Sequence, residues 1–289
     1  MDVELARTFL AVIDSGSFVE AAARLHVTQS TVSMRVKTLE AQLGKTLFER
    51  NKSGASLTAA GQQFQKHALA FVRVWQQARL EVSLPAGYDA ALTVGGTYSL
   101  WDGFLLPWVT RMRRSAPAIA IRTELGTSAA LMQHLVAGML DVGVMYTPER
   151  RPGLEVELLF EERLVLVSSE KRPRTRAGQG YLGRNYVYID WGPEFQADHG
   201  LAFPDLSTPG LYMELGSLGL DYLLANPASG YFPHRLAAPH LAGGALRLVA
   251  QAPVFAYPAY MVFPQDGAGS GLERALRTLR RSAAQLAEG

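Results

Sequence analysis

Apolar side chains recur at helical spacing in three consecutive segments near the start of the chain. The first segment carries them at Leu5, Phe9, Val12 and Ile13. Ser17 and Glu20 then form a capping box that begins a second helix, and Thr28 is placed to cap a third. In that third segment apolar residues recur in steps of four, three and four, at Val32, Val36, Leu39 and Leu43. The pattern predicts three short helices, the last two joined by a tight turn.

The face of the third helix opposite its apolar stripe is polar. At about 100° per residue, Ser30, Met34 and Lys37 lie on this outer face, and Thr31 and Ser33 flank it. Hydroxyl and amide groups exchange hydrogen bonds with base edges in the DNA major groove, and a lysine neutralises a phosphate. The pattern therefore favours a DNA-binding helix-turn-helix. An ordinary amphipathic three-helix bundle with a polar outer face would show the same periodicity.

The charge distribution supports the DNA-binding interpretation. Residues 1–87 hold 10 Lys and Arg against 7 Asp and Glu, a net charge of +3, whereas the other 202 residues hold 18 against 19. A small basic region on a near-neutral body is typical of a nucleic-acid-binding module attached to another domain.

Composition excludes several classes of protein. The chain has no cysteine, which rules out disulfides, thiolate metal sites and a cysteine nucleophile. No apolar run approaches the roughly 18 residues of a membrane span, and the start does not resemble a secretory signal. We therefore expect a cytoplasmic protein with no membrane partner.

Signatures of catalysis are missing from the sequence. Gly95-Gly96 lacks the Gly-Lys-Ser/Thr that completes a phosphate-binding loop, and neither a dinucleotide-binding fingerprint nor a G-x-S-x-G elbow occurs. The six histidines are scattered without zinc-type spacing, and we expect His199 to form a surface pair with Asp198. The sequence thus predicts no enzyme, no metal and no cofactor.

The stretch from Phe9 to Gly61 reads FLAVIDSGSFVEAAARLHVTQSTVSMRVKTLEAQLGKTLFERNKSGASLTAAG. It closely resembles the DNA-binding domain of LysR-type transcriptional regulators, with the helix-turn-helix, the LE-x-QLG ending and the wing LFERN…LTAAG in matching order. The resemblance implies a winged helix-turn-helix with its third helix in the major groove and its wing over the DNA backbone. It assigns groove contacts to Gln29, Ser30, Thr31 and Ser33, and a wing contact to Arg50.

This sequence departs from the family pattern at the base-reading positions. The family usually has proline after the glutamine and arginine after the second serine, where this chain has Ser30 and Met34, followed by Arg35. A methionine can touch a thymine methyl group but cannot hold guanine through two hydrogen bonds. We therefore expect a different base preference here, and we include Met34, Arg35 and Lys37 among the DNA-binding residues.

A long helix is predicted from a cap at Thr58 to about Val82. Its heptad seam is spaced 4, 3, 4, 3 and 4 at Phe64, Ala68, Phe71, Trp75, Ala78 and Val82. So short a seam could instead pack on its own domain. The resemblance implies that this helix pairs two subunits, giving a homodimer and, as is usual for the family, a homotetramer. Such a dimer would read half-sites about 10 bp, or a multiple of that, apart.

From Ala91 onward short apolar runs alternate with helical segments, which predicts α/β layers with parallel strands. This region is similar to the effector-binding part of the family, two periplasmic-binding-protein-like subdomains between which the chain crosses twice. We expect a winged helix-turn-helix head, all-α apart from its wing, at 1–58, a linker helix at 59–87 and an effector domain at 88–289. Within the effector domain, one subdomain would comprise 90–160 and 262–289, and the other 161–261.

Ligands of such folds bind at the carboxyl ends of the strands, where helix N-termini point free N–H groups inward. The turns at 95–99 and 126–128 are of this kind, and their hydroxyls could bind a carboxylate or another small acceptor, or merely cap helices. Aromatic residues follow other strand ends, as cleft walls or as core. The expected effector-binding residues are Thr97, Ser99, Ser128, Tyr146, Trp191 and Tyr231.

The sequence thus predicts a DNA-binding transcriptional regulator of LysR type whose small-molecule effector binds one arrangement more tightly than another. One alternative is a constitutive architectural DNA binder whose body serves only for oligomerisation, which a cleft plugged by its own side chains would favour. The other is a small-molecule enzyme with a vestigial DNA-binding head. The enzyme is the weakest hypothesis, because no nucleophile, metal or cofactor constellation is present.

Overall fold

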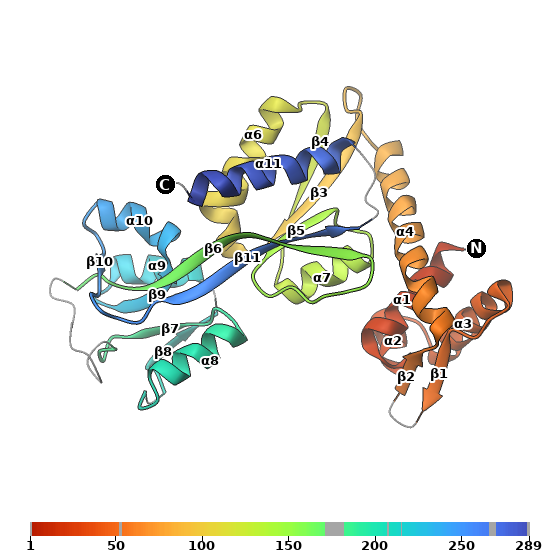
Figure 1. Cartoon of the computed structure of the whole chain (residues 1–289), viewed down its shortest axis with the longest axis horizontal. Helices are drawn as coiled ribbons and strands as arrows, with labels where there is room; N and C mark the ends of the chain where they lie inside the picture. The colour runs from red at the N-terminus through yellow and green to blue at the C-terminus, as the bar shows by residue number, and fades with distance from the viewer. Residues whose placement is uncertain are drawn as a thin grey trace.

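The computed structural model describes residues 2–51, 54–170, 182–206, 208–214, 216–265 and 270–287. It consists of a mainly helical head, one long helix and an α/β body (Figure 1). Within the described ranges, we find no helix that combines the length and the hydropathy of a membrane span.

The head begins with the three helices that the sequence predicts. They are α1 (Val3–Ser15), α2 (Phe18–Arg24) and α3 (Gln29–Leu43). The hydroxyls of Ser17 and Thr28 accept hydrogen bonds from backbone N–H groups in the first turns of α2 and α3, which confirms both predicted N-caps. Gly16 and Gly44 adopt left-handed conformations that end α1 and α3.

The apolar stripe of α3 faces the core of the head, as predicted, except at its last member. Val32, Val36 and Leu39 are fully buried, but Leu43 is exposed because it is the last residue of the helix. Aromatic rings fill much of the remaining core, with Phe9 lying 5.2 Å from Phe48 between ring centroids. The polar side of α3 therefore faces away from the core.

A two-stranded wing follows α3. Its strands are β1 (Phe48–Asn51) and β2 (Gly54–Leu57), paired antiparallel. The backbone N–H of Ala55 donates to the carbonyl of Gly16 at 2.8 Å, so the wing is fixed to the turn between α1 and α2. Gly54 has a φ of 132°, and a Cβ there would lie 2.5 Å from the same carbonyl oxygen, so only glycine fits at this contact.

The long helix α4 (Ala59–Val82) begins at the predicted cap, where the Thr58 hydroxyl accepts from the N–H of Gly61 at 3.0 Å. Its predicted seam divides into two parts. Phe64, Ala68 and Phe71 pack into the core of their own head, as the alternative interpretation proposed. The later members, Trp75, Ala78 and Val82, are exposed, Val82 at 90% of its surface.

The body contains, among the described residues, one seven-stranded sheet in which β10, β6, β11, β5, β3 and β4 follow in that order and β9 pairs with β6. The strands are β3 (Ala90–Gly96), β4 (Ile119–Leu125), β5 (Val142–Met145), β6 (Leu154–Ser168), β9 (Ser229–Pro233), β10 (Arg247–Leu248) and β11 (Phe255–Pro264). Strand β3 pairs parallel with β4 and β5, as predicted. The prediction was wrong for β6 and β11, which pair antiparallel along ten residues of β11.

The long strands β6 and β11 join two halves of the body (Figure 1). In the first half, α6 (Leu106–Ser115) and α11 (Ser270–Ala287) pack together over the sheet, and α7 (Ser128–Val136) covers its other face. Between β3 and α6 lie the short helix α5 (Tyr98–Leu100) and a π-helical turn, η1 (Trp101–Leu105).

The second half surrounds the other end of β6 and β11. A parallel strand pair, β7 (Val187–Ile189) and β8 (Leu211–Met213), lies there with helices α8 (Pro193–Ala202), α9 (Gly216–Ala225) and α10 (His234–Ala242). One continuous hydrophobic core extends through both halves, with Trp108 in the first and Tyr231 in the second fully buried.

The head and the body touch each other. Val136 of α7 packs against the hydrophobic core of the head. A Cβ at Gly138, which has a φ of 67°, would lie 2.8 Å from the Cα of Arg73 on α4. Arg151 of the body lies 3.4 Å from Asp14 at the end of α1, measured between Nη2 and Oδ1. The helix α4 is therefore seated on the first half of the body.

Candidate DNA-binding face and effector cleft

The outer face of α3 gathers most of the predicted DNA-binding residues. Gln29, Ser30 and Lys37 are exposed, and Met34 exposes 62% of its surface. A hollow on this face is lined by Ser30, Ser33, Met34, Lys37, Thr38 and Ala41. The helix therefore presents hydroxyls, a thioether and a cation together on a face that does not pack into the core of the head.

Hydroxyl contacts fix the first turn of this face. The Oγ1 atom of Thr28 lies 2.8 Å from the Oγ of Ser30 and 2.8 Å from the Oγ1 of Thr31. The backbone N–H of Thr31 also donates to Thr28 at 3.2 Å. The cap residue thus orients two predicted groove contacts as well as beginning the helix.

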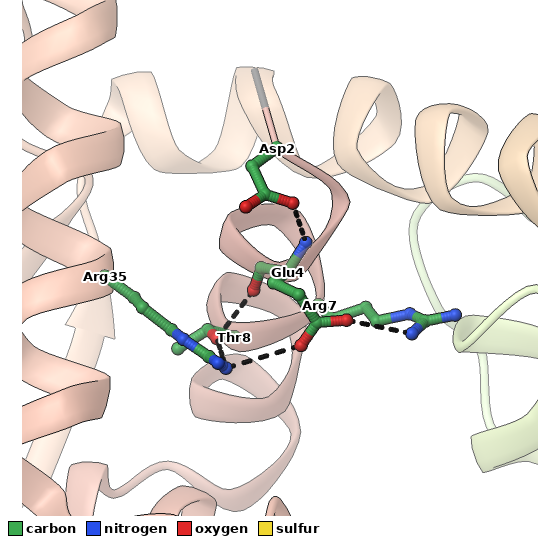
Figure 2. Close-up of polar contacts among 5 residues, drawn as sticks. All are labelled: Asp2, Glu4, Arg7, Thr8 and Arg35. Carbon is green, nitrogen blue, oxygen red and sulfur yellow. Dashed lines mark hydrogen bonds and ion pairs between the residues drawn. The ribbon is translucent and has the colours of Figure 1, made fainter.

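Arg35, which was predicted to contact DNA, forms hydrogen bonds with residues of α1 (Figure 2). Its Nη1 donates to Glu4 at 3.4 Å and to the hydroxyl of Thr8 at 3.3 Å, both on α1. Arg7 also donates to Glu4, at 3.0 Å, so one carboxylate serves two guanidinium groups. Arg35 therefore braces α3 against α1, and its side chain is turned away from the outer face.

The predicted wing contact, Arg50, lies on β1 opposite Ala55. Its side chain is outside the part of the structure that is described. The backbone position alone places it in the wing that the resemblance implied.

At the cleft, Thr97 lies between β3 and α5, and its backbone N–H donates to the carbonyl of Val144 at 3.1 Å. Its hydroxyl does not cap α5. Among the described residues, the side-chain oxygens of Thr97 and Ser217 are buried and have no hydrogen-bond partner. Ser217 lies in the first turn of α9, which packs against α5 from the other half of the body.

Ser217 was not predicted from the sequence. The only signal that could have found it is Gly216-Ser217 soon after the short apolar run of β8, because this is again a strand-to-helix turn. Ser128, which was predicted, is the first residue of α7, and the cap of that helix is instead Thr127, which accepts from the N–H of Ala130 at 3.3 Å.

Two further predicted residues, Ser99 and Tyr146, come together in a buried network. The Ser99 hydroxyl donates to the Tyr146 oxygen at 3.3 Å, and the Tyr146 hydroxyl donates to Glu162 at 3.0 Å. Glu162 also accepts from Nε of Arg235 at 2.5 Å. Burial raises the pKa of Glu162, and the Arg235 guanidinium opposes this rise. Sequence reasoning missed Glu162 and Arg235, because Glu162 stands in the charged run Glu161-Glu162-Arg163 and its partner Arg235 lies 73 residues further along the chain.

Trp191 and Tyr231, which were expected at the cleft, are buried in the hydrophobic core of the body. Tyr231 is fully buried, and its hydroxyl donates to the carbonyl of Pro253 at 3.0 Å. The indole N–H of Trp191 donates to the carbonyl of Tyr231 at 2.9 Å. A Cβ at Gly216 would lie 2.1 Å from the Trp191 ring, so this ring supports the start of α9. The alternative that aromatic residues at strand ends are core holds for both.

His199 is buried, and the expected surface pair with Asp198 was wrong. Its Nε2 lies 2.8 Å from the hydroxyl of Tyr186, and aromatic rings surround it, including Phe195 at 5.2 Å between centroids. Burial lowers the pKa of His199 to about 4. The ring therefore serves as a neutral core residue.

A metal site is not formed within the described ranges, where no group of three or more His, Cys, Asp or Glu side chains could hold an ion. At the junction of the two halves of the body, the polar groups include the hydroxyls of Thr97 and Ser217 and the pair of Arg235 with Glu162.

Comparison with protein families gives two matches that together cover most of the chain. Residues 3–62 match the family described as bacterial regulatory helix-turn-helix protein, lysR family. Residues 86–285 match the LysR substrate binding domain.

Two relatives of similar length carry the same name. The HTH-type transcriptional regulator HdfR of Yersinia enterocolitica is 29% identical over 294 residues, covering 99% of each chain. The HdfR of Salmonella typhimurium is 29% identical over 271 residues, covering 92% of this chain and 93% of its own.

Two solved structures share the fold of this chain along nearly its whole length. Full-length LysG of Corynebacterium glutamicum with bound effector Arg has a TM-score of 0.61 and 22% identity, covering 99% of both chains. ArgP of Mycobacterium tuberculosis has a TM-score of 0.60 and 23% identity, covering 98% of both chains.

Proposed function

Because this chain belongs to the LysR family of bacterial regulatory helix-turn-helix proteins, we propose that α3 reads promoter DNA under the control of a small molecule bound in the body. It is a transcriptional regulator with a helix-turn-helix DNA-binding domain and a LysR substrate binding domain, and it is not an enzyme. The observation that carries the proposal is the exposed polar face of α3 around Met34 and Lys37. The proposed division is a head at 1–58, a linker helix at 59–87 and an effector domain at 88–289.

We assign separate roles to the residues on this face. Lys37 neutralises a phosphate, while Ser33, together with Gln29, Ser30 and Thr31, hydrogen-bonds base edges. Met34 contacts a thymine methyl group, since its exposed thioether is apolar. Arg50 contacts the DNA backbone from the wing. Arg35 positions α3 through Glu4 and takes no part in the contact itself.

The roles of Lys37 and Ser33 are tested by equilibrium binding at several salt concentrations to a promoter fragment and to a shuffled duplex. Lys37→Ala should weaken binding to both duplexes about equally and reduce the salt slope by about 1 for each bound head, because each head loses one phosphate contact. Ser33→Ala should cost about 1–3 kcal/mol on the promoter fragment only.

The matched control is Arg281→Ala, which removes an exposed cation of α11 in the body and should change neither quantity. If Lys37→Ala altered base preference and left the salt slope intact, its assignment to a phosphate would be wrong.

We propose that the exposed part of α4 pairs two subunits. Trp75, Ala78 and Val82 continue the heptad spacing beyond the part that the head covers, which leaves an apolar stripe for a second copy. A homodimer of this kind holds two heads for half-sites about 10 bp or a multiple apart, and pairs of dimers would form a homotetramer. The protein would act in the bacterial cytoplasm, where promoter DNA lies.

For the effector, we propose a small molecule whose hydrogen-bonding groups meet Thr97 and Ser217, with Ser128 near the neighbouring strand end. The proposal is supported by two buried hydroxyls without hydrogen-bond partners, one at the start of α5 and one in the first turn of α9, since these two helices contact each other from opposite halves of the body. Buried polar groups are normally satisfied, so a ligand that hydrogen-bonds both would be favoured there.

The effector proposal is tested by thermal unfolding of the full chain against a panel of metabolites. A metabolite that raises the Tm of the wild type by several degrees should lose this effect in the Thr97→Val/Ser217→Ala double variant. The control Thr123→Val alters an exposed residue of β4 and should keep the full shift. An equal shift in all three proteins would place the effector elsewhere.

A further inference from the structure

One side chain, Arg235, bridges the two halves of the body. It lies in the first turn of α10, in the second half. Its Nη2 donates to the carbonyl of Ser99 at 2.8 Å and its Nη1 to the carbonyl of Asp102, both in the first half. Its Nε donates to Glu162 of β6, the strand that runs through both halves. Each guanidinium nitrogen therefore has a partner, and the partners come from two separate segments.

The backbone of the first half is shaped to receive this guanidinium. Within η1 the helical geometry breaks at Asp102, whose ψ is 125°, and at Gly103, whose φ is 72°. The carbonyl of Asp102, at this break, accepts the hydrogen bond from Arg235. A Cβ at Gly103 would lie 2.8 Å from Nη1 of Arg235, and the left-handed φ also favours glycine.

The charge pair at the centre of this bridge is shielded from solvent. The side chain of Glu162 is 4% exposed and that of Arg235 is 13% exposed. The second carboxylate oxygen of Glu162 accepts from Tyr146, which in turn accepts from Ser99. Breaking a buried ion pair leaves an uncompensated charge, so Arg235 and Glu162 depend on each other.

We infer that Arg235 is a built-in occupant of the cleft, which holds the two halves together without a ligand and excludes acidic small molecules from the Ser99–Tyr146 side. A ligand carboxylate that bound Arg235 would have to take the place of the Glu162 carboxylate. The two carboxylates would then lie close together in a buried site, where their like charges repel. The exclusion of acids rests on the proposed effector function, whereas the bridge itself does not.

The bridge is tested in the full-length protein by hydrogen–deuterium exchange, which needs neither DNA nor an effector. Arg235→Met keeps a long apolar side chain and removes the donors, so the amides of residues 98–105 should exchange at least tenfold faster than in the wild type. The matched control Arg247→Met removes an exposed arginine of β10 and should leave those amides unchanged.

Because Arg235→Met leaves Glu162 buried without its partner, the double variant Arg235→Met/Glu162→Gln is measured beside it. This variant carries no charge at positions 162 and 235 and should fold, yet the amides of residues 98–105 should still exchange rapidly. Wild-type exchange rates in the folded double variant would overturn the bridge.

The exclusion of acids is tested with benzoate as the probe. Glu162→Gln frees the charge of Arg235, so benzoate should slow exchange at 98–105 in this variant and have no effect there in the wild type. Equal protection of both proteins would overturn the exclusion. Because all these measurements concern the free protein, failure of DNA binding would leave their outcome unaffected.

Discussion

At the scale of single residues, His199 couples the stability of the body to pH. Its pKa of about 4 in the folded protein lies below its ordinary value of 6.5, because the imidazole is buried among aromatic rings. The folded state thus binds a proton less readily than the unfolded state. The resulting stability is fully present above pH 6.5 and is lost as the pH falls toward 4.

We therefore expect the free energy of unfolding to decrease by about 1–3 kcal/mol between pH 6.5 and 4 on account of this residue. Urea unfolding at both pH values, for the wild type and for His199→Phe, isolates the effect, because phenylalanine fits an aromatic site and does not titrate. An identical pH dependence in the two proteins would show that His199 contributes nothing to it.

The residues of α3 show how far helical periodicity predicts side-chain positions. The 100° spacing placed Ser30, Met34 and Lys37 on the outer face correctly. It could not foresee that Arg35, at the edge of that face, turns inward, because its partner Glu4 is 31 residues away in the sequence. Periodicity fixes where a Cα lies, whereas the end of a long side chain is decided by contacts between helices.

At the scale of elements, α4 combines two tasks in one helix. Its first turns complete the core of the head, and its last turns present the apolar stripe of Trp75, Ala78 and Val82. The same heptad spacing thus first places side chains in the core of the head and then places side chains on an exposed surface. The sequence predicted the seam. It could not show where the part buried in the head ends and the exposed part begins, because both parts have the same heptad spacing.

Trp75→Ala should weaken self-association at least tenfold, because it removes the largest exposed side chain of this stripe. Sedimentation equilibrium of the full chain measures the effect. Leu201→Ala, which truncates an exposed apolar residue of α8, is the control and should leave association unchanged. Wild-type association of Trp75→Ala would exclude this stripe from the interface.

The strands β6 and β11 show what local patterns miss. The longest apolar run within β6 is residues 164–167, because charges at Glu155, Glu157 and Glu161 interrupt the rest of the strand. The antiparallel pairing with β11 joins residues 91 to 110 positions apart, from Leu164 with Phe255 to Leu154 with Pro264, and no local period encodes such a pairing. The parallel strands β3, β4 and β5 were predictable, because their apolar runs are short, continuous and separated by helices.

At the scale of the whole molecule, the head is seated on its own body. Val136 enters the head core, Gly138 lies against α4, and Arg151 pairs with Asp14. A change in the first half of the body can therefore reach α1 and α4 through packed contacts. An effector would use this path only by binding one arrangement of the two halves more tightly than another.

The cleft also bears on the alternative of a constitutive architectural DNA binder. Arg235 and Glu162 fill the Ser99–Tyr146 side with the protein's own groups, which by itself favours that alternative. The hydroxyls of Thr97 and Ser217 argue against a constitutive DNA binder, because they are buried without hydrogen-bond partners and so leave groups for an effector to bind. The two observations together favour a regulator whose effector uses only part of the cleft.

We propose above all that the outer face of α3 reads duplex bases. The most direct test selects bound duplexes from a randomised DNA library, once with the wild-type protein and once with Met34→Arg. Arginine holds guanine through two hydrogen bonds, which methionine cannot do. We predict that Met34→Arg changes one base pair in each half-site to place guanine there and leaves the rest of the motif as the wild type selects it. Recovery of the wild-type motif by Met34→Arg would contradict the claim.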